Sequence, residues 1–128
     1  MDLNQITLPC QDYAASVAFY VRLGLTQIVD SPPRYARFET EAGTTLSIHS
    51  VDSSCQDSGC VIYFEVTDVN AAVDRLKKAG VTFTAEPTDQ RHLWREAYLK
   101  DPFGNSICLY HAGQNRRYPP WRIGGEQA

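Results

Sequence analysis

The chain has 128 residues, of which 43% are hydrophobic and 21% are charged, a composition that fits one soluble globular domain with a sizeable core and not a disordered chain. Its formal net charge of −3 gives no electrostatic reason to bind polyanions. We therefore expect neither nucleic acid nor a membrane as a partner.

The N-terminus MDLNQITLPC has neither the basic region nor the apolar stretch of a secretory signal. No apolar run approaches the ~20 residues that a membrane-spanning helix needs. These two observations predict a cytoplasmic protein.

Four cysteines, at positions 10, 55, 60 and 108, are present in a chain long enough to fold without disulfides. We expect reduced thiols. Cys55 and Cys60 are separated by four residues, which is a poor match to the two-residue spacing of a zinc knuckle, and no second Cys/His pair follows them.

The first strand and helix are repeated later in the chain, as ITLPCQDYAASVAFYVRLGLTQI and then IYFEVTDVNAAVDRLKKAGVTFT. Asp12 and Asp68 stand at the same place in the two segments, where a helix N-cap is expected. Gly24 and Gly80 likewise match as the residues that end the helices. Each half of the chain therefore begins with a strand, a helix and a second strand.

The remainder of each half has the pattern of further strands, YARFET and TTLSIHS in the first half, HLWREAYLK and NSICLYH in the second. Each half is thus a βαβββ module, which leaves one face of its sheet open and cannot bury itself alone. We predict an α+β fold in which two such modules form a curved mixed sheet around a cleft, with the helices on the outer face.

The predicted domain organisation is a single domain over residues 1–113. Module 1 covers residues 4–50, a polar linker residues 51–59, and module 2 residues 60–111. Residues 114–128 form a tail rich in proline and aromatic residues. Two consecutive prolines forbid a helix there, and we expect the first ten residues of the tail to lie against the domain or a partner subunit.

The strands present two faces. One is apolar and suits the helices, whereas the other mixes polar and aromatic residues, as in a small-molecule site. An ordinary half-solvated sheet or a dimer interface would have a similar composition. We favour a binding cleft because both halves leave the same face unburied. The residues on this second face are Gln5, Thr7, Ser47, His49, Val61, Tyr63, Glu65, Cys108 and Tyr110.

Ligand contacts are expected from two groups of side chains. The aromatic rings would stack on an organic molecule, and polar groups would orient it. Arg95 alternates with Glu96, so only one of the two can face the cleft, where Arg95 would suit an anionic or carbonyl-bearing ligand. The full set of predicted ligand-binding residues is Gln5, His49, Tyr63, Glu65, Trp94, Arg95 and Tyr110.

Three segments resemble the glyoxalase, bleomycin-resistance and extradiol-dioxygenase superfamily, also called vicinal oxygen chelate proteins. LPCQDYAASVAFYVRLGL is similar to its opening strand and helix, VIYFEVTDVNAAVDRLKKAGV to the start of its second module, and AYLKDPFGNSICLYH to its last turn and strand. The resemblance extends from Ile6 to Tyr110. It implies the fold but no single function, since the superfamily includes lyases, dioxygenases, epimerases, thiol transferases and antibiotic-binding proteins.

Metal-dependent members of that superfamily hold a divalent cation with four side chains, and by the resemblance these positions fall on Gln5, Ser47, Val61 and Cys108. Valine cannot ligate a metal, and glutamine with serine offers little charge to a hard cation. The resemblance therefore implies no metal cofactor. The alternative is a divalent metal such as zinc bound by the Cys108 thiolate and His49.

The predicted function is metal-independent binding of a small organic molecule by a homodimer, as the resemblance implies. The rival prediction is an enzyme, a glyoxalase-like lyase or a dioxygenase, that uses nonstandard metal ligands or His49 and Cys108 as catalytic residues. A third possibility is an interaction role with the tail as a docking arm.

Overall fold

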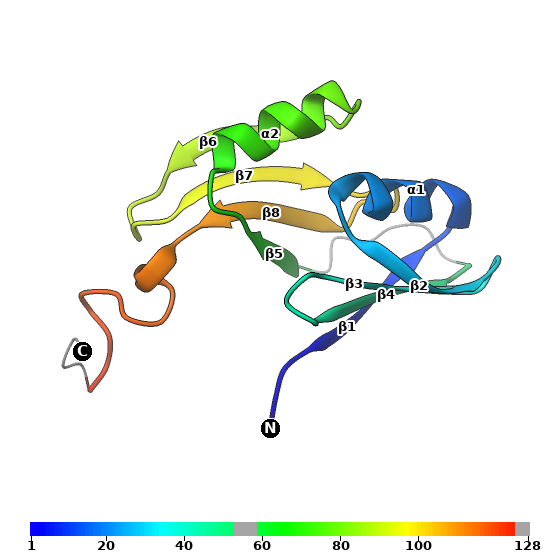
Figure 1. Ribbon diagram of the computed structural model, residues 1–128, viewed down its shortest axis with the longest axis horizontal. Helices are drawn as coiled ribbons and strands as arrows, with labels where there is room; N and C mark the ends of the chain where they lie inside the picture. The colour runs from blue at the N-terminus through cyan, green and yellow to red at the C-terminus, as the bar shows by residue number, and fades with distance from the viewer. Residues whose placement is uncertain (53–58, 125–128) are drawn as a thin grey trace. The chain divides into compact units, whose positions relative to one another are not determined.

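The computed structural model describes residues 1–52 and 59–124, so Cys55 and most of the predicted linker lie outside the described residues. Two compact units divide the chain. Each contains one α-helix and one four-stranded sheet among its described residues (Figure 1), which confirms the predicted α+β class and the two βαβββ modules. Unit 1 comprises Met1–Cys60 with Lys100–Asn105, and unit 2 comprises Val61–Leu99 with Ser106–Ala128.

In unit 1 the last strand of the module lies beside the first, which forms one edge of the sheet. The sheet order is β1-β4-β3-β2, with β1 parallel to β4 and the other neighbours antiparallel. The parallel pair places the start of the module beside its end. The elements are β1 (Gln5–Cys10), α1 (Tyr13–Leu23), β2 (Thr26–Ser31), β3 (Tyr35–Glu39) and β4 (Thr45–Ser50).

Unit 2 repeats this arrangement. Its sheet order is β5-β8-β7-β6, with β5 parallel to β8 and β6 antiparallel to β7. A short 3₁₀ helix, η1, follows the last strand. The elements are β5 (Val61–Glu65), α2 (Val69–Lys78), β6 (Phe83–Asp89), β7 (Arg95–Lys100), β8 (Ser106–His111) and η1 (Gly113–Asn115).

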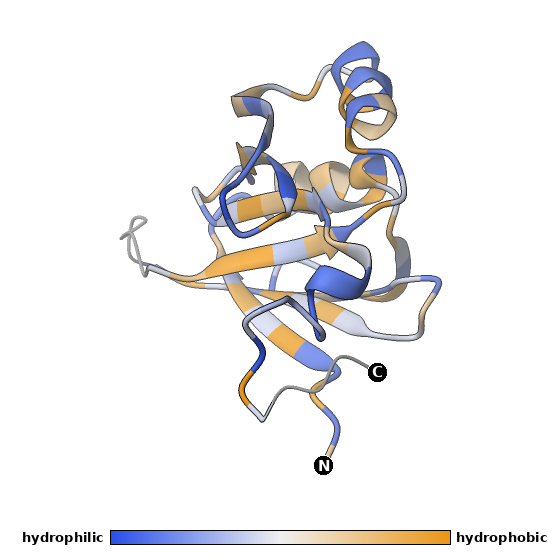
Figure 2. Cartoon of the chain, turned by 90° about the vertical axis from the view of Figure 1, so that its left-hand side faces the viewer, coloured by the Kyte–Doolittle hydropathy of each residue, from blue (hydrophilic) through white to orange (hydrophobic). Residues whose placement is uncertain are grey.

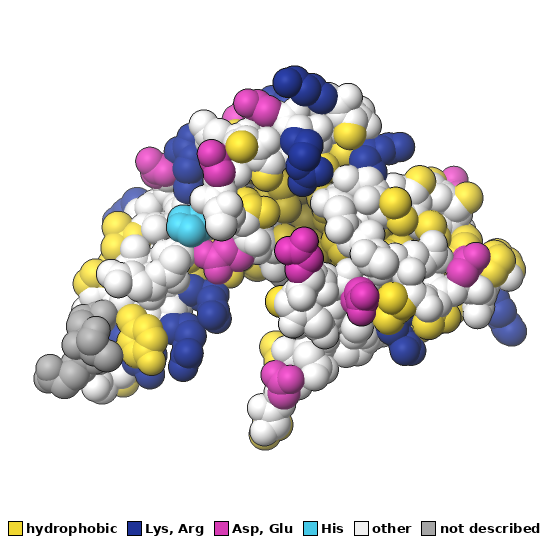
Figure 3. Space-filling model, viewed as in Figure 1, with side chains coloured by type: hydrophobic (Ala, Val, Ile, Leu, Met, Phe, Trp, Pro, Cys, Tyr) yellow, Lys and Arg dark blue, Asp and Glu magenta, His cyan; other side chains and the backbone are white. Residues whose placement is uncertain are grey.

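Both helices begin at the predicted aspartates. The carboxylates of Asp12 and Asp68 each accept a hydrogen bond of 3.0 Å from the backbone N–H three residues later, which satisfies an N–H that the helix itself leaves unpaired. Gly24 ends α1 with a φ of +118°, a left-handed conformation that glycine adopts without steric cost. Basic side chains near the end of α2 suit the negative end of its dipole, and Figure 3 shows Lys and Arg side chains gathered over this helix.

One face of each sheet packs against the unit's helix. In unit 1 the buried apolar residues include Phe19, Tyr20, Phe38 and Ile48, and in unit 2 Val73 of α2 packs in one cluster with its neighbours on the sheet. Full burial of such side chains contributes about 1.5–3 kcal/mol each. Figure 2 shows hydrophobic residues alternating with more polar ones along the strands, as the predicted two-faced pattern requires.

The turn DPFGN between β7 and β8 belongs to unit 1 and is organised by the carboxylate of Asp101, which is only 5% exposed. Its Oδ1 accepts hydrogen bonds from the backbone N–H groups of Phe103, Gly104 and Asn105 at 2.8–3.0 Å. Its Oδ2 accepts from the Tyr20 hydroxyl at 2.5 Å and from the Asn105 side chain at 2.7 Å. Burial and the Asp101 charge raise the pKa of Tyr20, so the tyrosine remains a proton donor to this carboxylate.

The C-terminal tail is predicted to lie against the domain or a partner subunit, and its first residues contact the domain. Trp94 of unit 2 donates from its indole Nε1 to the carbonyl of Asn115 at 3.1 Å, which fixes the start of the tail. Trp121 and Ile123, however, are 58% and 97% exposed. Packing against a partner subunit stays a prediction.

Among the described residues, no helix is long and apolar enough to cross a membrane.

We predict that Asp101→Asn lowers the free energy of unfolding by about 3 kcal/mol, because an amide replaces an acceptor that serves five donors in a buried setting. Urea denaturation measures this loss. Asp74→Asn, an exposed aspartate of α2, is the matched control and should change stability by less than about 0.5 kcal/mol. Equal effects of the two substitutions would contradict the role assigned to Asp101.

Candidate functional site

Three aromatic rings of unit 2 contact one another on the sheet face that does not carry α2. Trp94 stacks on Tyr110 with ring centroids 4.7 Å apart and planes at 27°, and Tyr63 meets both rings edge-on at 5.8 and 5.4 Å. Such stacked and edge-on pairs are the favoured aromatic geometries. We call Tyr63, Trp94 and Tyr110 the aromatic cluster.

Strand register explains how these rings meet. In the parallel pair β5–β8, Tyr63 lies opposite Cys108, so Tyr63 and Tyr110 share a face one pleat apart. Trp94 approaches from the turn before β7, where Leu93 adopts a positive φ of 71°. The structure therefore brings together the three aromatic residues that the sequence predicted as ligand contacts.

The aromatic cluster combines a buried floor with an accessible ring. Tyr110 is 6% exposed and belongs to a buried cluster with Cys108 and Ala112, against which Trp94 and Tyr98 pack. Tyr63 is 44% exposed, a large fraction for an aromatic ring held by two others. A surface that is rigid, aromatic and partly open suits the flat face of an organic molecule.

A buried carboxylate lies beside these rings. Glu96 is 4% exposed; its Oε1 accepts from the Tyr98 hydroxyl at 2.8 Å, and its Oε2 lies 2.9 Å from Nε2 of His92. Burial, followed by the hydrogen bond to Glu96, raises the pKa of Tyr98, which keeps this hydroxyl protonated. The His92 ring meets the Trp94 ring edge-on, with centroids 5.2 Å apart, so the pair of His92 and Glu96 lies directly beside the aromatic cluster.

Arg95 lies on the other face of β7. Its Nε donates to Oδ1 of Asn70 in α2, and its Nη1 forms an ion pair with Asp89, both at 2.9 Å. Alternation along the strand accounts for this, since Glu96 occupies the face of the aromatic cluster. The Arg95 side chain, which was predicted to contact the ligand, therefore does not lie on the face of the aromatic cluster.

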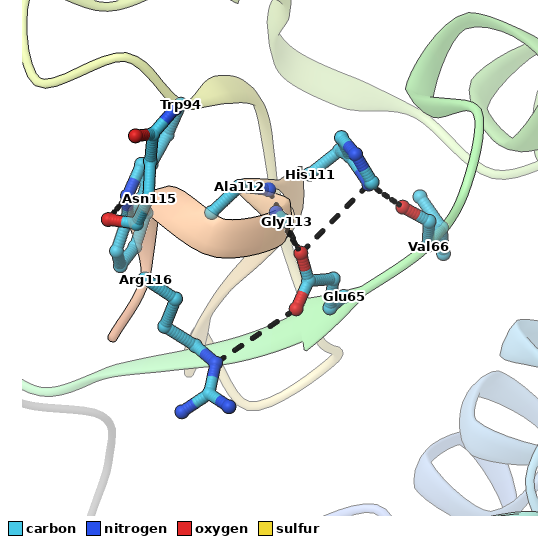
Figure 4. A network of polar contacts seen from close by, with 8 residues as sticks. All are labelled: Glu65, Val66, Trp94, His111, Ala112, Gly113, Asn115 and Arg116. Carbon is cyan, nitrogen blue, oxygen red and sulfur yellow. Dashed lines mark hydrogen bonds and ion pairs between the residues drawn. The ribbon is translucent and has the colours of Figure 1, made fainter. Parts of the chain in front are cut away.

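The Glu65 carboxylate, predicted to orient a ligand, binds backbone N–H groups of its own unit. Figure 4 shows its Oε2 accepting hydrogen bonds of 2.8 and 2.9 Å from the backbone N–H groups of Ala112 and Gly113, while Nε of Arg116 lies 3.9 Å from its Oε1. Burial alone would raise the pKa of Glu65, but these N–H groups, together with the charges of His111 and Arg116, lower it. The carboxylate caps η1 at the point where the tail leaves the sheet.

The two predicted catalytic residues belong to different units. Cys108 of unit 2 is fully buried, with its Sγ 3.6 Å from the carbonyl of Leu109, and burial followed by the negative charge of Glu96 raises its pKa to about 12. A nucleophilic cysteine needs the opposite shift. His49 of unit 1 is exposed near the end of β4. An acid–base pair of Cys108 and His49 stays a prediction.

The four positions at which the resemblance places metal ligands do not fit a divalent cation. In unit 1, Gln5 donates from Nε2 to the buried Ser47 hydroxyl at 3.0 Å. In unit 2, Val61 has no donor atom and the Cys108 thiol holds its proton. None of the four is a carboxylate or an imidazole, the ligands such ions prefer. Within residues 1–52 and 59–124, no three His, Cys, Asp or Glu side chains are grouped so that they could hold a metal ion.

Sequence reasoning missed the contribution of His92 and Glu96. Neither residue was among the predicted ligand-binding residues, and the sequence left open whether Arg95 or Glu96 faces the cleft. The contact between His92 and Glu96 requires the turn at Leu93. This turn brings together two residues that are four positions apart but do not belong to a helix. The sequence showed only that Arg95 and Glu96 point to opposite faces of their strand.

We predict that Cys10 and Cys108, both buried and both with a raised pKa, do not react quickly with a thiol reagent in the native protein. At most two of the four cysteines should then be labelled within minutes at pH 8. Cys108→Ala should leave native labelling unchanged and remove one reactive thiol in urea, and Cys10→Ala is the matched control. Loss of a fast thiol from native Cys108→Ala would indicate an activated cysteine.

Comparison with known proteins extends over most of the chain. Residues 2–109 match the family model described as the Glyoxalase/Bleomycin resistance protein/Dioxygenase superfamily. A search among curated proteins gave no match.

Several solved structures share the fold at low sequence identity. A glyoxalase/bleomycin resistance protein/dioxygenase from Nocardioides is 22% identical with a TM-score of 0.75, over 88% of this chain and 83% of that one. Lactoylglutathione lyase from Agrobacterium tumefaciens is 17% identical with a TM-score of 0.70, over 86% and 92% of the two chains. TioX from Micromonospora sp. ML1 is 19% identical with a TM-score of 0.70, over 88% and 99%.

Proposed function

This chain belongs to the Glyoxalase/Bleomycin resistance protein/Dioxygenase superfamily, and from that premise we propose that it binds a small planar organic molecule on the aromatic cluster of unit 2, without the metal of the superfamily's metal-dependent members. The superfamily's name joins enzymes to resistance proteins, so membership alone does not choose between catalysis and binding. The side chains at the site support binding.

One observation carries the proposal, the exposed Tyr63 ring held edge-on against the stacked pair Trp94 and Tyr110. Because each ring is fixed by the other two, little conformational entropy is lost when a ligand contacts them. A flat aromatic ligand on this surface removes apolar area from water on both partners. Binding therefore needs no metal to orient the ligand.

The neighbouring carboxylate narrows the ligand chemistry. Glu96 receives one hydrogen bond from Tyr98 and one contact from His92, whereas a carboxylate has about four acceptor positions. The negative charge of this carboxylate beside the aromatic rings favours a ligand that carries a positive charge or an N–H donor. We therefore propose planar aromatic amines as the ligand class.

A second candidate function rests on the contact between His92 and Glu96. In the neutral tautomer whose Nε2–H donates a hydrogen bond to the carboxylate, Nδ1 of His92 carries a free lone pair. This atom is then able to accept a proton from a bound substrate. Proton-transfer catalysis of this kind uses neither Cys108 nor a metal. The metal-dependent lyase or dioxygenase with nonstandard ligands is supported less well, because Val61 and the protonated Cys108 offer a cation little.

The binding function is tested by fluorescence in a Trp121→Phe protein, in which Trp94 is the only remaining tryptophan. We expect saturable quenching by planar aromatic amines, with 9-aminoacridine as the first probe. Tyr63→Ala should weaken binding about tenfold, or ~1.4 kcal/mol, because one ring of the surface is lost. Tyr118→Ala, which removes a tyrosine of unit 2 outside the aromatic cluster, is the matched control.

Two outcomes would overturn the proposal. The first is the absence of saturable quenching by any amine of the panel, and the second is equal affinity in the Tyr63→Ala and Tyr118→Ala proteins. His92→Gln separates the two candidate functions, since it should preserve binding but abolish any turnover of a bound compound.

A further inference from the structure

A polar network on the sheet of unit 1 is not used by the aromatic cluster. It joins Gln5 of β1, Tyr35 and Arg37 of β3, and Ser47 of β4. Arg37 pairs with Ser47 across the sheet, and the alternate residues Ala36 and Phe38 are buried on the opposite face toward α1. The four polar side chains therefore share the face that the helix leaves uncovered.

The hydrogen-bond roles in this network follow from the chemistry of each donor. The Gln5 amide nitrogen donates to Ser47 Oγ at 3.0 Å, and Arg37 Nε donates to the Tyr35 hydroxyl oxygen at 2.9 Å, because neither nitrogen is an acceptor. The hydroxyls of Tyr35 and Ser47 lie 2.6 Å apart. The direction of this last bond decides which hydroxyl keeps an unused proton.

Burial decides the direction. Ser47 is fully buried, and Tyr35 is the one acceptor found for its proton within the part of the chain that the structure describes. An unpaired buried hydroxyl proton costs about 1–3 kcal/mol, so Ser47 donates to Tyr35. The Tyr35 oxygen then accepts two hydrogen bonds while its own O–H proton stays available to an outside acceptor.

Arg37 adds positive charge beside that proton. Its guanidinium carbon lies 5.4 Å from the centroid of the Tyr35 ring, and its Nε is engaged by the tyrosine hydroxyl. Within the described residues, Arg37 forms no ion pair with a carboxylate, unlike Arg95 and Arg116. A half-buried guanidinium without a counter-ion is a ready binding group for an anionic oxygen.

We propose that Tyr35 and Arg37 form a second binding site, on unit 1, for the carboxylate of a small organic acid. The Tyr35 hydroxyl donates to one carboxylate oxygen, and the terminal nitrogens of Arg37 donate to the other. Gln5 and Ser47 act as positioning residues, since they orient the tyrosine and do not contact the acid.

The test uses isobutyrate as the probe, because an aliphatic acid has no ring to stack on the aromatic cluster and so reports on unit 1 alone. Binding is followed by ¹H–¹⁵N NMR through the Arg37 Nε–H signal and the amides of β3 and β4. We expect Arg37→Gln to weaken binding about tenfold or more, and Tyr35→Phe to weaken it several-fold, because each removes a charged or polarised donor. The neutral isostere isobutyramide should bind much more weakly than isobutyrate.

The controls separate this site from general charge effects and from misfolding. Arg34→Gln removes an exposed arginine of the same unit and should leave isobutyrate affinity unchanged. Arg37→Lys keeps the charge without the forked donors and should bind with intermediate affinity, with a spectrum that reports the fold. Equal affinity of the wild type and Arg37→Gln, equal binding of the acid and the amide, or no shift at β3 and β4 would each overturn the proposal.

Discussion

The parallel pairing of β5 with β8 is the constraint on which the candidate site depends. Its register sets Tyr63 opposite Cys108 and Glu65 opposite Tyr110, so the α2 side of the sheet takes Ile107 and the other side takes the aromatic rings. A shift of one residue would reverse both faces at once. Unit 1 obeys the same rule through β1 and β4, where the uncovered face carries the polar network instead of aromatic rings.

Elements with a local chemical signal were predictable from the sequence. Asp12 and Asp68 cap the helices of the two modules, and Gly24 ends the first helix with a positive φ. The last two strands of each module, β3 and β4 in unit 1 and β7 and β8 in unit 2, lie within the segments predicted for them. Each of these signals depends on a few neighbouring residues, and the capping aspartate occurs in both modules. The shared face of Tyr63 and Tyr110 was predictable for the same reason, since alternation along a strand is a local property.

Contacts that depend on tertiary placement were not predictable. The Glu96 carboxylate becomes the polar centre of the site because the turn at Leu93 brings His92 to it. Glu65 has the right phase for a ligand contact, yet the backbone N–H groups after β8 engage it. Cys108 likewise lies on the expected face, but its burial and the negative charge of Glu96 raise its pKa, which is the opposite of the shift that a nucleophilic cysteine needs. Sequence alone gives the face of a residue and not its partners.

In the proposed function, planar ligands bind to the uncovered face of unit 2 through its aromatic cluster. Chemical-shift mapping of ¹⁵N-labelled protein with 9-aminoacridine tests it most directly, because it locates the ligand without a substitution. We expect the largest shifts at the Trp94 indole N–H and at the amides of Tyr63 and Tyr110. Shifts centred on Trp121, or on β1 and β4 of unit 1, would contradict it.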